Sequence, residues 1–181
     1  MNPHFIFNAI NSIQSFLVYE ENDKAEKYLL KFAQLIRQTL NNSRETYVSI
    51  ETEIDTLTKY LDLERMRFKD NFSYKITNLL GKSKQEIKVP SMLIQPFAEN
   101  AVIHGFSTLV SGGKINITLK PMDNSQILCI IEDNGIGRRK AMKQSSEKHI
   151  SVGTTITEER LKASETKHGI NFKVETIDIE N

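Results

Sequence analysis

The segment that decides the fold is residues 127–137, ILCIIEDNGIG. Its five consecutive apolar residues predict a strand that is central in its sheet and covered by helices on at least one face. Asp133 follows at the mouth of this strand, and Gly135 and Gly137 allow a ligand to approach the backbone closely. A carboxylate in this place could accept a hydrogen bond from a planar amino group such as that of adenine. The alternative interpretation is an ordinary turn between two elements.

A second polar group of residues lies upstream, in QPFAENAVIHG. Glu99 and Asn100 interrupt an otherwise apolar segment, 91–106, which predicts a largely buried helix. His104 follows Asn100 by four residues and therefore shares its helix face. The amide oxygen of Asn100 could bind a hard cation such as Mg²⁺, which takes oxygen ligands together with nucleotide phosphates. The alternative to a role in ligand binding is that Glu99 and Asn100 cap a helix or are core polar groups whose hydrogen bonds are satisfied within the protein.

The periodicity of apolar residues divides the chain into two parts. Residues 1–45 predict a helical hairpin, whose apolar stripe either pairs with another copy or docks on the remainder. Residues 46–181 predict an α+β fold with helices on one side of a mixed sheet, and Ser49 fits an N-cap for its first helix. The predicted elements are helices over 3–19, 24–42, 50–69, 91–106 and 156–166, strands over 72–77, 85–90, 112–120, 126–134 and 170–179, and a connection over 41–49.

The composition argues against several classes of protein. The chain has 24 Lys and Arg residues against 23 Asp and Glu, and this near-neutral balance argues against a nucleic-acid binder. No apolar run approaches the ~20 residues that span a bilayer. Cys129 is the single cysteine, so neither an internal disulfide nor a cysteine metal cage is expected, and a reducing, cytoplasmic setting is favoured. The four histidines lack the spacing of a zinc site.

Taken in order, the motifs resemble one family. Residues 95–105 resemble the asparagine box of the GHKL ATPase superfamily, residues 127–137 its first glycine box, and residues 152–161, VGTTITEERL, its second glycine box. The N-terminal MNPHFIFNAINSI looks like the phosphoacceptor box of sensor histidine kinases of the LytS/YehU type. That branch also carries a segment similar to YLDLERMRF at residues 60–68. The resemblance covers nearly the whole chain.

The resemblance implies a protein histidine kinase. It implies a dimerising phosphoacceptor hairpin over 1–45 and a GHKL (Bergerat-type) α/β sandwich over 46–181. The expected reaction is ATP-dependent phosphorylation of His4, followed by transfer to an aspartate of a response-regulator receiver domain. By position, the resemblance implies that Asp133 recognises adenine and that the backbone at Gly135 and Gly137 passes close to the nucleotide. It implies that Asn100 binds Mg²⁺, that Glu99 and His104 are polar supports near the phosphates, and that Glu99 accepts the proton. Gly153 would mark the end of a lid, and Thr154 or Thr155 would contact a phosphate.

Two departures from the family pattern leave alternatives open. Ile156 stands where the second glycine box usually has Asn, which favours a signalling scaffold with the same fold and weak ATP binding. Phe5 follows His4 where many other kinases have an acid, so no residue beside His4 serves as base. A GHKL ATPase that performs mechanical work is a third possibility. Because the chain opens at the phosphoacceptor box, we expect a cytoplasmic fragment whose sensor and membrane segments lie upstream.

Overall fold

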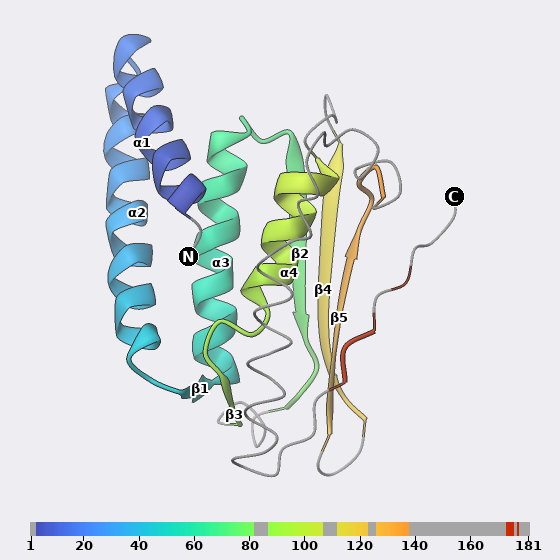
Figure 1. The fold of residues 1–181 in the computed structure, drawn as a ribbon. Coiled ribbons are helices and arrows are strands. Elements are labelled where there is room, and N and C mark those ends of the chain that lie inside the picture. Colours follow the sequence, from blue (N-terminus) through green and yellow to red (C-terminus); the bar gives the residue numbers. More distant parts are fainter. Residues whose placement is uncertain are drawn as a thin grey trace.

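The computed structural model describes residues 3–81, 87–106, 112–122, 126–137, 173–175 and 177. Figure 1 shows the N-terminal helices at one side of the molecule, further helices in the middle and a sheet at the other side. The helix predicted over 156–166 lies outside the described residues, and so does most of the strand predicted over 170–179.

The predicted N-terminal hairpin is present. It consists of α1 (Pro3–Val18) and α2 (Asn22–Ser43), joined by a short turn in which the Glu21 N–H donates to the Phe16 carbonyl at 2.8 Å. The Phe16 and Tyr28 rings pack with centroids 5.8 Å apart. The buried apolar side chains of the two helices are Phe5, Ala9, Ala25, Tyr28 and Leu35. These positions follow the helical spacing of the sequence, because a stripe of this kind must be removed from water.

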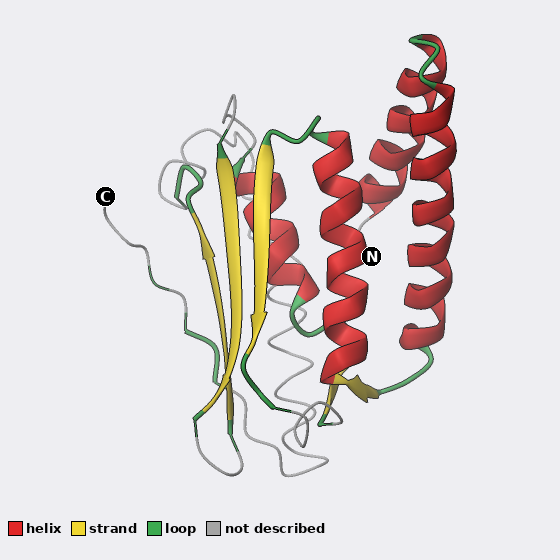
Figure 2. Ribbon diagram, turned by 180° about the vertical axis from the view of Figure 1, so that it is seen from behind, coloured by secondary structure: helices red, strands yellow, loops and turns green. Residues whose placement is uncertain are grey.

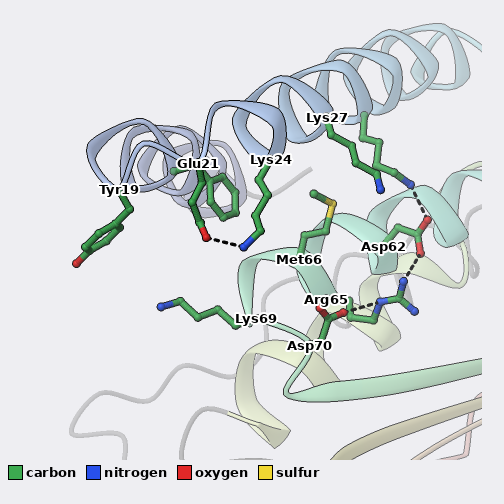
Figure 3. A pocket seen from close by; sticks show the side chains of 11 residues that line it. Tyr19, Glu21, Lys24, Lys27, Asp62, Arg65, Met66, Lys69 and Asp70 are labelled. Carbon is green, nitrogen blue, oxygen red and sulfur yellow. Dashed lines mark hydrogen bonds and ion pairs between the residues drawn. The ribbon is translucent and has the colours of Figure 1, made fainter.

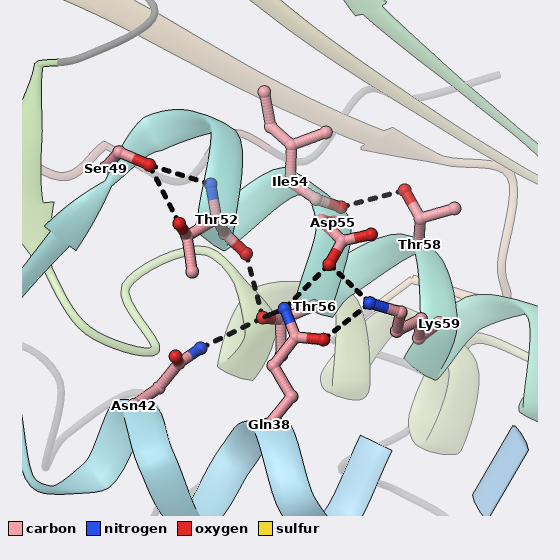
Figure 4. Close-up of polar contacts among 9 residues, drawn as sticks. All are labelled: Gln38, Asn42, Ser49, Thr52, Ile54, Asp55, Thr56, Thr58 and Lys59. Atoms are coloured by element: carbon pink, nitrogen blue, oxygen red, sulfur yellow. Dashed lines mark hydrogen bonds and ion pairs between the residues drawn. The ribbon is translucent and has the colours of Figure 1, made fainter. Parts of the chain in front are cut away.

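The hairpin docks on the remainder of the chain, which is one of the two predicted outcomes. Its partner is α3 (Ile50–Arg67), and polar side chains join α2 to α3 at the lower end of the contact (Figure 4). Gln38 and Asn42 donate to Thr56 Oγ1 at 2.9 and 3.0 Å, and Lys59 donates to Gln38 Oε1 at 2.6 Å. Because Thr56 and Asn42 are buried, these bonds satisfy polar groups that would otherwise destabilise the contact.

The start of α3 agrees with the predicted N-cap, and the segment before it differs from the prediction. Ser49 Oγ accepts the backbone N–H of Thr52 at 3.1 Å, as an N-cap should (Figure 4). The connection predicted over 41–49 contains a short strand, β1 (Tyr47–Ser49), which pairs antiparallel with β3 (Lys88–Pro90). Pairing between segments so far apart in the chain has no local signature in the sequence.

The main sheet is mixed, as predicted. Its described strands are β2 (Phe72–Asn78), β4 (Gly113–Pro121) and β5 (Ile127–Asp133), in the order β2-β4-β5. β2 runs parallel to β4, and β4 antiparallel to β5. Among these described strands β4 has neighbours on both sides, and the apolar residues of β5 are half-buried. The prediction that β5 is central stays a prediction, because the strand predicted over 170–179 lies mostly outside the described residues. An unbroken apolar run reports covered faces and carries no information on which neighbours a strand has.

Helices cover one face of this sheet, which confirms the α+β prediction (Figure 2). On β4, Ile115, Ile117 and Leu119 are fully buried, while the intervening side chains point to the other face. The helix predicted over 91–106 begins later, as α4 (Gln95–Asn100), and continues as a π-helical turn over Ala101–Gly105. Met92 explains the late start, because its φ of +56° lies outside the helical region.

Candidate functional site

His4 lies in the first turn of α1 and its side chain is exposed. The Asn8 side-chain amide nitrogen lies 3.2 Å from Nδ1 and 3.4 Å from Nε2 of the His4 ring. The next residue, Phe5, is buried against the rings of Tyr60 and Phe32, with centroid distances of 5.2 and 6.1 Å. Phe5 therefore anchors the turn on α3 while the neighbouring imidazole remains accessible to a reaction partner.

The surface of α3 under this turn contains buried polar groups from the YLDLERMRF segment. Tyr60 is 1% exposed, and burial together with the nearby charges of Glu64 and Glu99 raises its pKa well above the usual value. Arg67 Nε donates to both carboxylate oxygens of Glu64 at 3.1 Å. This carboxylate is also 1% exposed, and a buried charge of this kind needs such a partner. Tyr60 thus lies between the turn that carries His4 and the helix that carries Glu99.

Glu99 and Asn100 close the α-helical part of α4 and are half-buried. Glu99 Oε1 accepts a hydrogen bond from Gln95 Nε2 at 2.8 Å. Burial raises the pKa of Glu99, the Gln95 bond opposes this shift, and the charge of Glu64 adds to it. A carboxylate with a raised pKa is a better proton acceptor near neutral pH than an ordinary one. The π-helical turn that follows is a feature often found at functional sites.

Asp133 ends β5 on the face of the sheet that the helices cover. It is paired directly with Ile115 of β4, which is fully buried, and residues opposite each other in an antiparallel pair share a face. Asp133 Oδ1 accepts the backbone N–H of Gly135 at 2.8 Å. Among the described residues, the structure gives Oδ2 no hydrogen-bond partner. One carboxylate oxygen is therefore held by the loop and the other is available to a ligand.

The loop after Asp133 is held in place by hydrogen bonds of the Asn134 side chain. Asn134 accepts the Lys114 N–H at 2.6 Å and donates to the Gly112 carbonyl at 2.9 Å, which ties the loop to the start of β4. Gly137 has a φ of +77°, a conformation that favours glycine, and a Cβ there would meet no neighbouring atom. The loop therefore has the open backbone that a close ligand requires.

The structure brings α4 and the end of β5 to the same end of the sheet (Figure 1). The Phe106 ring, just after the π-helical turn, lies against Gly113 at the start of β4, two residues before the partner of Asp133. The π-helical turn that follows Asn100 therefore lies next to the end of the sheet where Asp133 closes β5. The side chain of His104, together with Gly153, Thr154 and Thr155, lies outside what the structure describes.

Comparison with known proteins identifies the family. Residues 1–72 match the family model described as "Histidine kinase". The chain is 34% identical over 137 residues to the "Sensor protein LytS" of Staphylococcus haemolyticus, which covers 76% of this chain and 23% of that protein. It is 33% identical over 140 residues to the "Sensor histidine kinase/phosphatase LytS" of Staphylococcus aureus, which covers 77% of this chain and 24% of that protein.

Over about three quarters of its length the chain is similar to LytS-type histidine kinases. It spans about a quarter of the length of the curated relatives that it matches. No described helix is long and apolar enough to cross a membrane. Within the described residues, no group of three or more His, Cys, Asp or Glu side chains could hold a metal ion. The segment with His4 and the YLDLERMRF segment both fall within the part that matches the family model.

One groove in the described part of the chain lies away from α4 and the sheet. It has a volume of about 690 Å³ and lies between the tip of the hairpin and the end of α3 (Figure 3). Three of its five cations form ion pairs with the three acids in the same groove, and the lining keeps a surplus of two positive charges. Its lining residues are Phe16, Tyr19, Glu21, Lys24, Lys27, Lys31, Asp62, Arg65, Met66, Lys69 and Asp70. None of them belongs to α4 or to the sheet.

A smaller groove lies next to the turn of α1 that carries His4. It has a volume of about 220 Å³ and lies between α1 and the end of α3. Its lining is polar and cationic, and includes the Asn8 side chain that contacts His4. The lining residues are Asn8, Asn11, Ser12, Ser15, Phe16, Arg67 and Lys69.

Two residues near this region were not found from the sequence. Asn134 joins the loop after β5 to β4, and Glu53 is a fully buried acid whose partners precede α4. The sequence contains a signal for Glu53, because it lies four residues before Leu57 and thus on the apolar side of α3. No local pattern links the acids at the start of this helix to a distant partner. Asn134 has no comparable signal, since its two partners lie at the start of another strand.

Proposed function

We propose that this chain is the catalytic portion of a two-component sensor histidine kinase. It phosphorylates His4 from ATP and then passes the phosphoryl group to an aspartate on a response-regulator receiver domain. The observation that carries the proposal is the exposed His4 on the first turn of α1, inside the segment that matches the histidine kinase family model. A neutral imidazole is a competent nucleophile near neutral pH, and phosphoryl transfer depends mainly on alignment and charge neutralisation.

The nucleotide cleft in this proposal belongs to a GHKL (Bergerat-type) sandwich over 46–181. Asp133 accepts the adenine amino group through Oδ2, and the backbone at Gly135 and Gly137 passes close to the nucleotide. This role is supported by the position of Asp133 on the covered face of the sheet and by its hydrogen bond to the Gly135 N–H. Gly153, Thr154 and Thr155 complete the cleft as the end of a lid and as phosphate contacts.

The phosphate end of the cleft belongs to α4. Asn100 offers an amide oxygen to Mg²⁺, which neutralises phosphate charge when bound. His104 is a second polar support there. In the reaction, a ring nitrogen of His4 forms a bond to the γ-phosphorus, the bond to the bridging oxygen breaks, and ADP leaves with that oxygen. Glu99 is our candidate for accepting the ring proton, since its pKa is raised by burial.

We also propose that the hairpin over 1–45 joins two copies of the chain. One apolar side of the hairpin docks on α3, while Ile6, Ile10 and Leu17 of α1 recur at helical spacing and are 39%, 52% and 54% exposed. Leu29 and Leu40 continue this apolar surface on α2, at 51% and 59% exposure. Apolar patches of this extent mark interfaces.

In this proposal the parent protein is a membrane-anchored sensor, and the part described by this chain lies in the cytoplasm.

Incubation with labelled ATP and Mg²⁺ tests the proposal. We expect an acid-labile, base-stable phosphoprotein, whose label is lost in His4→Ala and retained in the matched control His149→Ala. Asp133→Asn should lower ATP affinity at least about tenfold, since a charged hydrogen bond contributes roughly 1.5–3 kcal/mol. Equal labelling of His4→Ala and the unmodified chain would refute the assignment of His4.

The second candidate function is a signalling scaffold with the same fold. Ile156, in place of the Asn of the second glycine box, favours it. A folded chain that binds no ATP in a nucleotide titration would support the scaffold and contradict the kinase. Micromolar to submillimolar binding that is lost in Asp133→Asn would support the kinase.

A further inference from the structure

Glu53 in the first turn of α3 is a buried acid to which the proposed reaction gives no role. Its side chain is 2% exposed, although acidic residues are rarely buried without strong partners. Both carboxylate oxygens accept backbone N–H groups: Oε2 from Met92 at 2.9 Å and Oε1 from Ile94 at 2.8 Å. These two residues immediately precede α4. Glu53 therefore holds the start of the helix that carries Asn100.

The start of α4 depends on this contact, because the helix has no cap of its own. Ile94 occupies the N-cap position and makes no side-chain hydrogen bond to the first turn. The first N–H groups of a helix need acceptors, and here the carboxylate of another helix supplies one. Met92 also has a φ of +56°, a conformation that is unfavourable for residues other than glycine. The bond from Met92 to Glu53 helps to hold this conformation.

The other wall of the proposed cleft also lies near Glu53. The pKa of the Cys129 thiol is raised to about 12, mainly by burial and further by the charge of Glu53. Cys129 is in the middle of β5, and its side chain shares a face with Ile131 and Asp133 because strand residues two apart point the same way. Glu53 thus lies between the start of α4 and the covered face of the strand that ends in Asp133.

We infer that Glu53 is a positioning residue that sets the place of Asn100 relative to β5 and so controls the Mg²⁺-phosphate end of the cleft. The inference rests on the proposed function. Asn100 follows Ile94 by six residues, about 9 Å along a helix axis, so a shift at the start of α4 reaches Asn100 directly. Asp133 is held by the pairing of β5 with β4, in which Glu53 takes no part. Loss of Glu53 should therefore affect the phosphate end more than the adenine end.

The test compares ADP binding with and without Mg²⁺ in Glu53→Gln, with Glu51→Gln as matched control. Glu51 lies in the same turn and is exposed. The amide introduced by Glu53→Gln would keep the shape of the side chain but turn an NH₂ group toward a backbone N–H, so one bond is lost. We expect the gain in ADP affinity produced by Mg²⁺ to fall at least about tenfold in Glu53→Gln, with less than about a threefold change for magnesium-free ADP. Glu51→Gln should match the unmodified chain in both.

Each other outcome is decisive. If both ADP affinities fall together in folded protein, or neither changes, the positioning role is overturned while the proposed function stands. If the unmodified chain binds no ADP, the proposed function fails and the inference with it. If Glu53→Gln does not fold, hydrogen exchange in the unmodified chain replaces it: Mg²⁺-ADP should slow exchange of the Met92 and Ile94 amides at least about tenfold, and magnesium-free ADP should not. Equal slowing by both ligands would overturn the inference.

Discussion

Phe5→Ala should separate the buried contact that anchors α1 on α3 from the exposed surface of α1. Phe5 is 4% exposed and packs on Tyr60 and Phe32, whereas Phe7, two residues later, is 66% exposed. Phe7→Ala is therefore a control with the same chemistry and a different environment. Phe5 is the contact that joins the turn of His4 to α3, so its loss should free that turn.

The expected cost follows from burial. Truncation of a buried Phe to Ala costs about 3–5 kcal/mol, which includes the favourable ring contacts. Phe5 lies in the first turn of its helix, where the structure can relax, so we expect the low end, about 3 kcal/mol. For a chain of this size that corresponds to a fall of roughly 6–12 °C in the unfolding temperature. Phe7→Ala should change the free energy of unfolding by less than about 0.5 kcal/mol.

Urea unfolding at protein concentrations where the chain is monomeric measures both variants, and hydrogen exchange locates the change. Phe5→Ala should speed exchange of the α1 amides while those of β4 remain protected. Phe7→Ala should instead weaken self-association at higher concentration, as a surface residue of the proposed interface. A cost below about 1 kcal/mol for Phe5→Ala, or equal costs for the two variants, would refute the docking of α1 on α3.

Three further variants test the fold around the site. Ser49→Ala removes the cap of α3 and should cost about 1 kcal/mol in urea unfolding; an unchanged midpoint would contradict the cap. At Asp62, burial raises the carboxyl pKa, but the hydrogen bond from Lys31 and other contacts outweigh it and hold the pKa below its usual value. A carboxyl group with a lowered pKa stabilises the fold at pH values above the usual pKa of about 4, and this stabilisation is lost as the pH falls. The Asp62→Asn variant should therefore lose less thermal stability than the unmodified chain when the pH is lowered below about 5. Identical pH profiles of the two proteins would refute the ion pair of Asp62 with Lys31. Gly113→Ala would place a Cβ 2.9 Å from the Phe72 Cβ, and the overlap should cost roughly 1–3 kcal/mol by thermal unfolding, whereas a neutral effect would show that the contact relaxes.

Much of the fold could be predicted because its signals are local. The stripe of apolar residues in α1 and α2 and the alternation in β4 follow from the geometry of one helix or one strand. The cap at Ser49 involves an atom three residues away. The candidate site was found in the same way, because Asn100 and Asp133 are polar residues at the ends of apolar segments. That the two side chains line one cleft stays a prediction.

Other features depended on contacts that no local pattern encodes. The apolar run of β5 predicted coverage, yet the described sheet places β4 in the centre. The hairpin stripe allowed docking or pairing, and the structure docks one side on α3 and leaves a second apolar surface exposed. A stripe records that a surface must leave water, but the partner is chosen by competition among all the surfaces of the folded chain.

The sequence by itself determined most of the described helices and strands, and it pointed to the family resemblance and to the residues of a possible site. Only the tertiary structure decided how those residues are held. Glu53 shows the physical reason, since its partners lie 39 and 41 residues away in the chain. A carboxylate on a helix can be read locally as a partner of the helix dipole. Its role at the start of α4 arises only when burial removes water and leaves two distant backbone N–H groups as its acceptable partners.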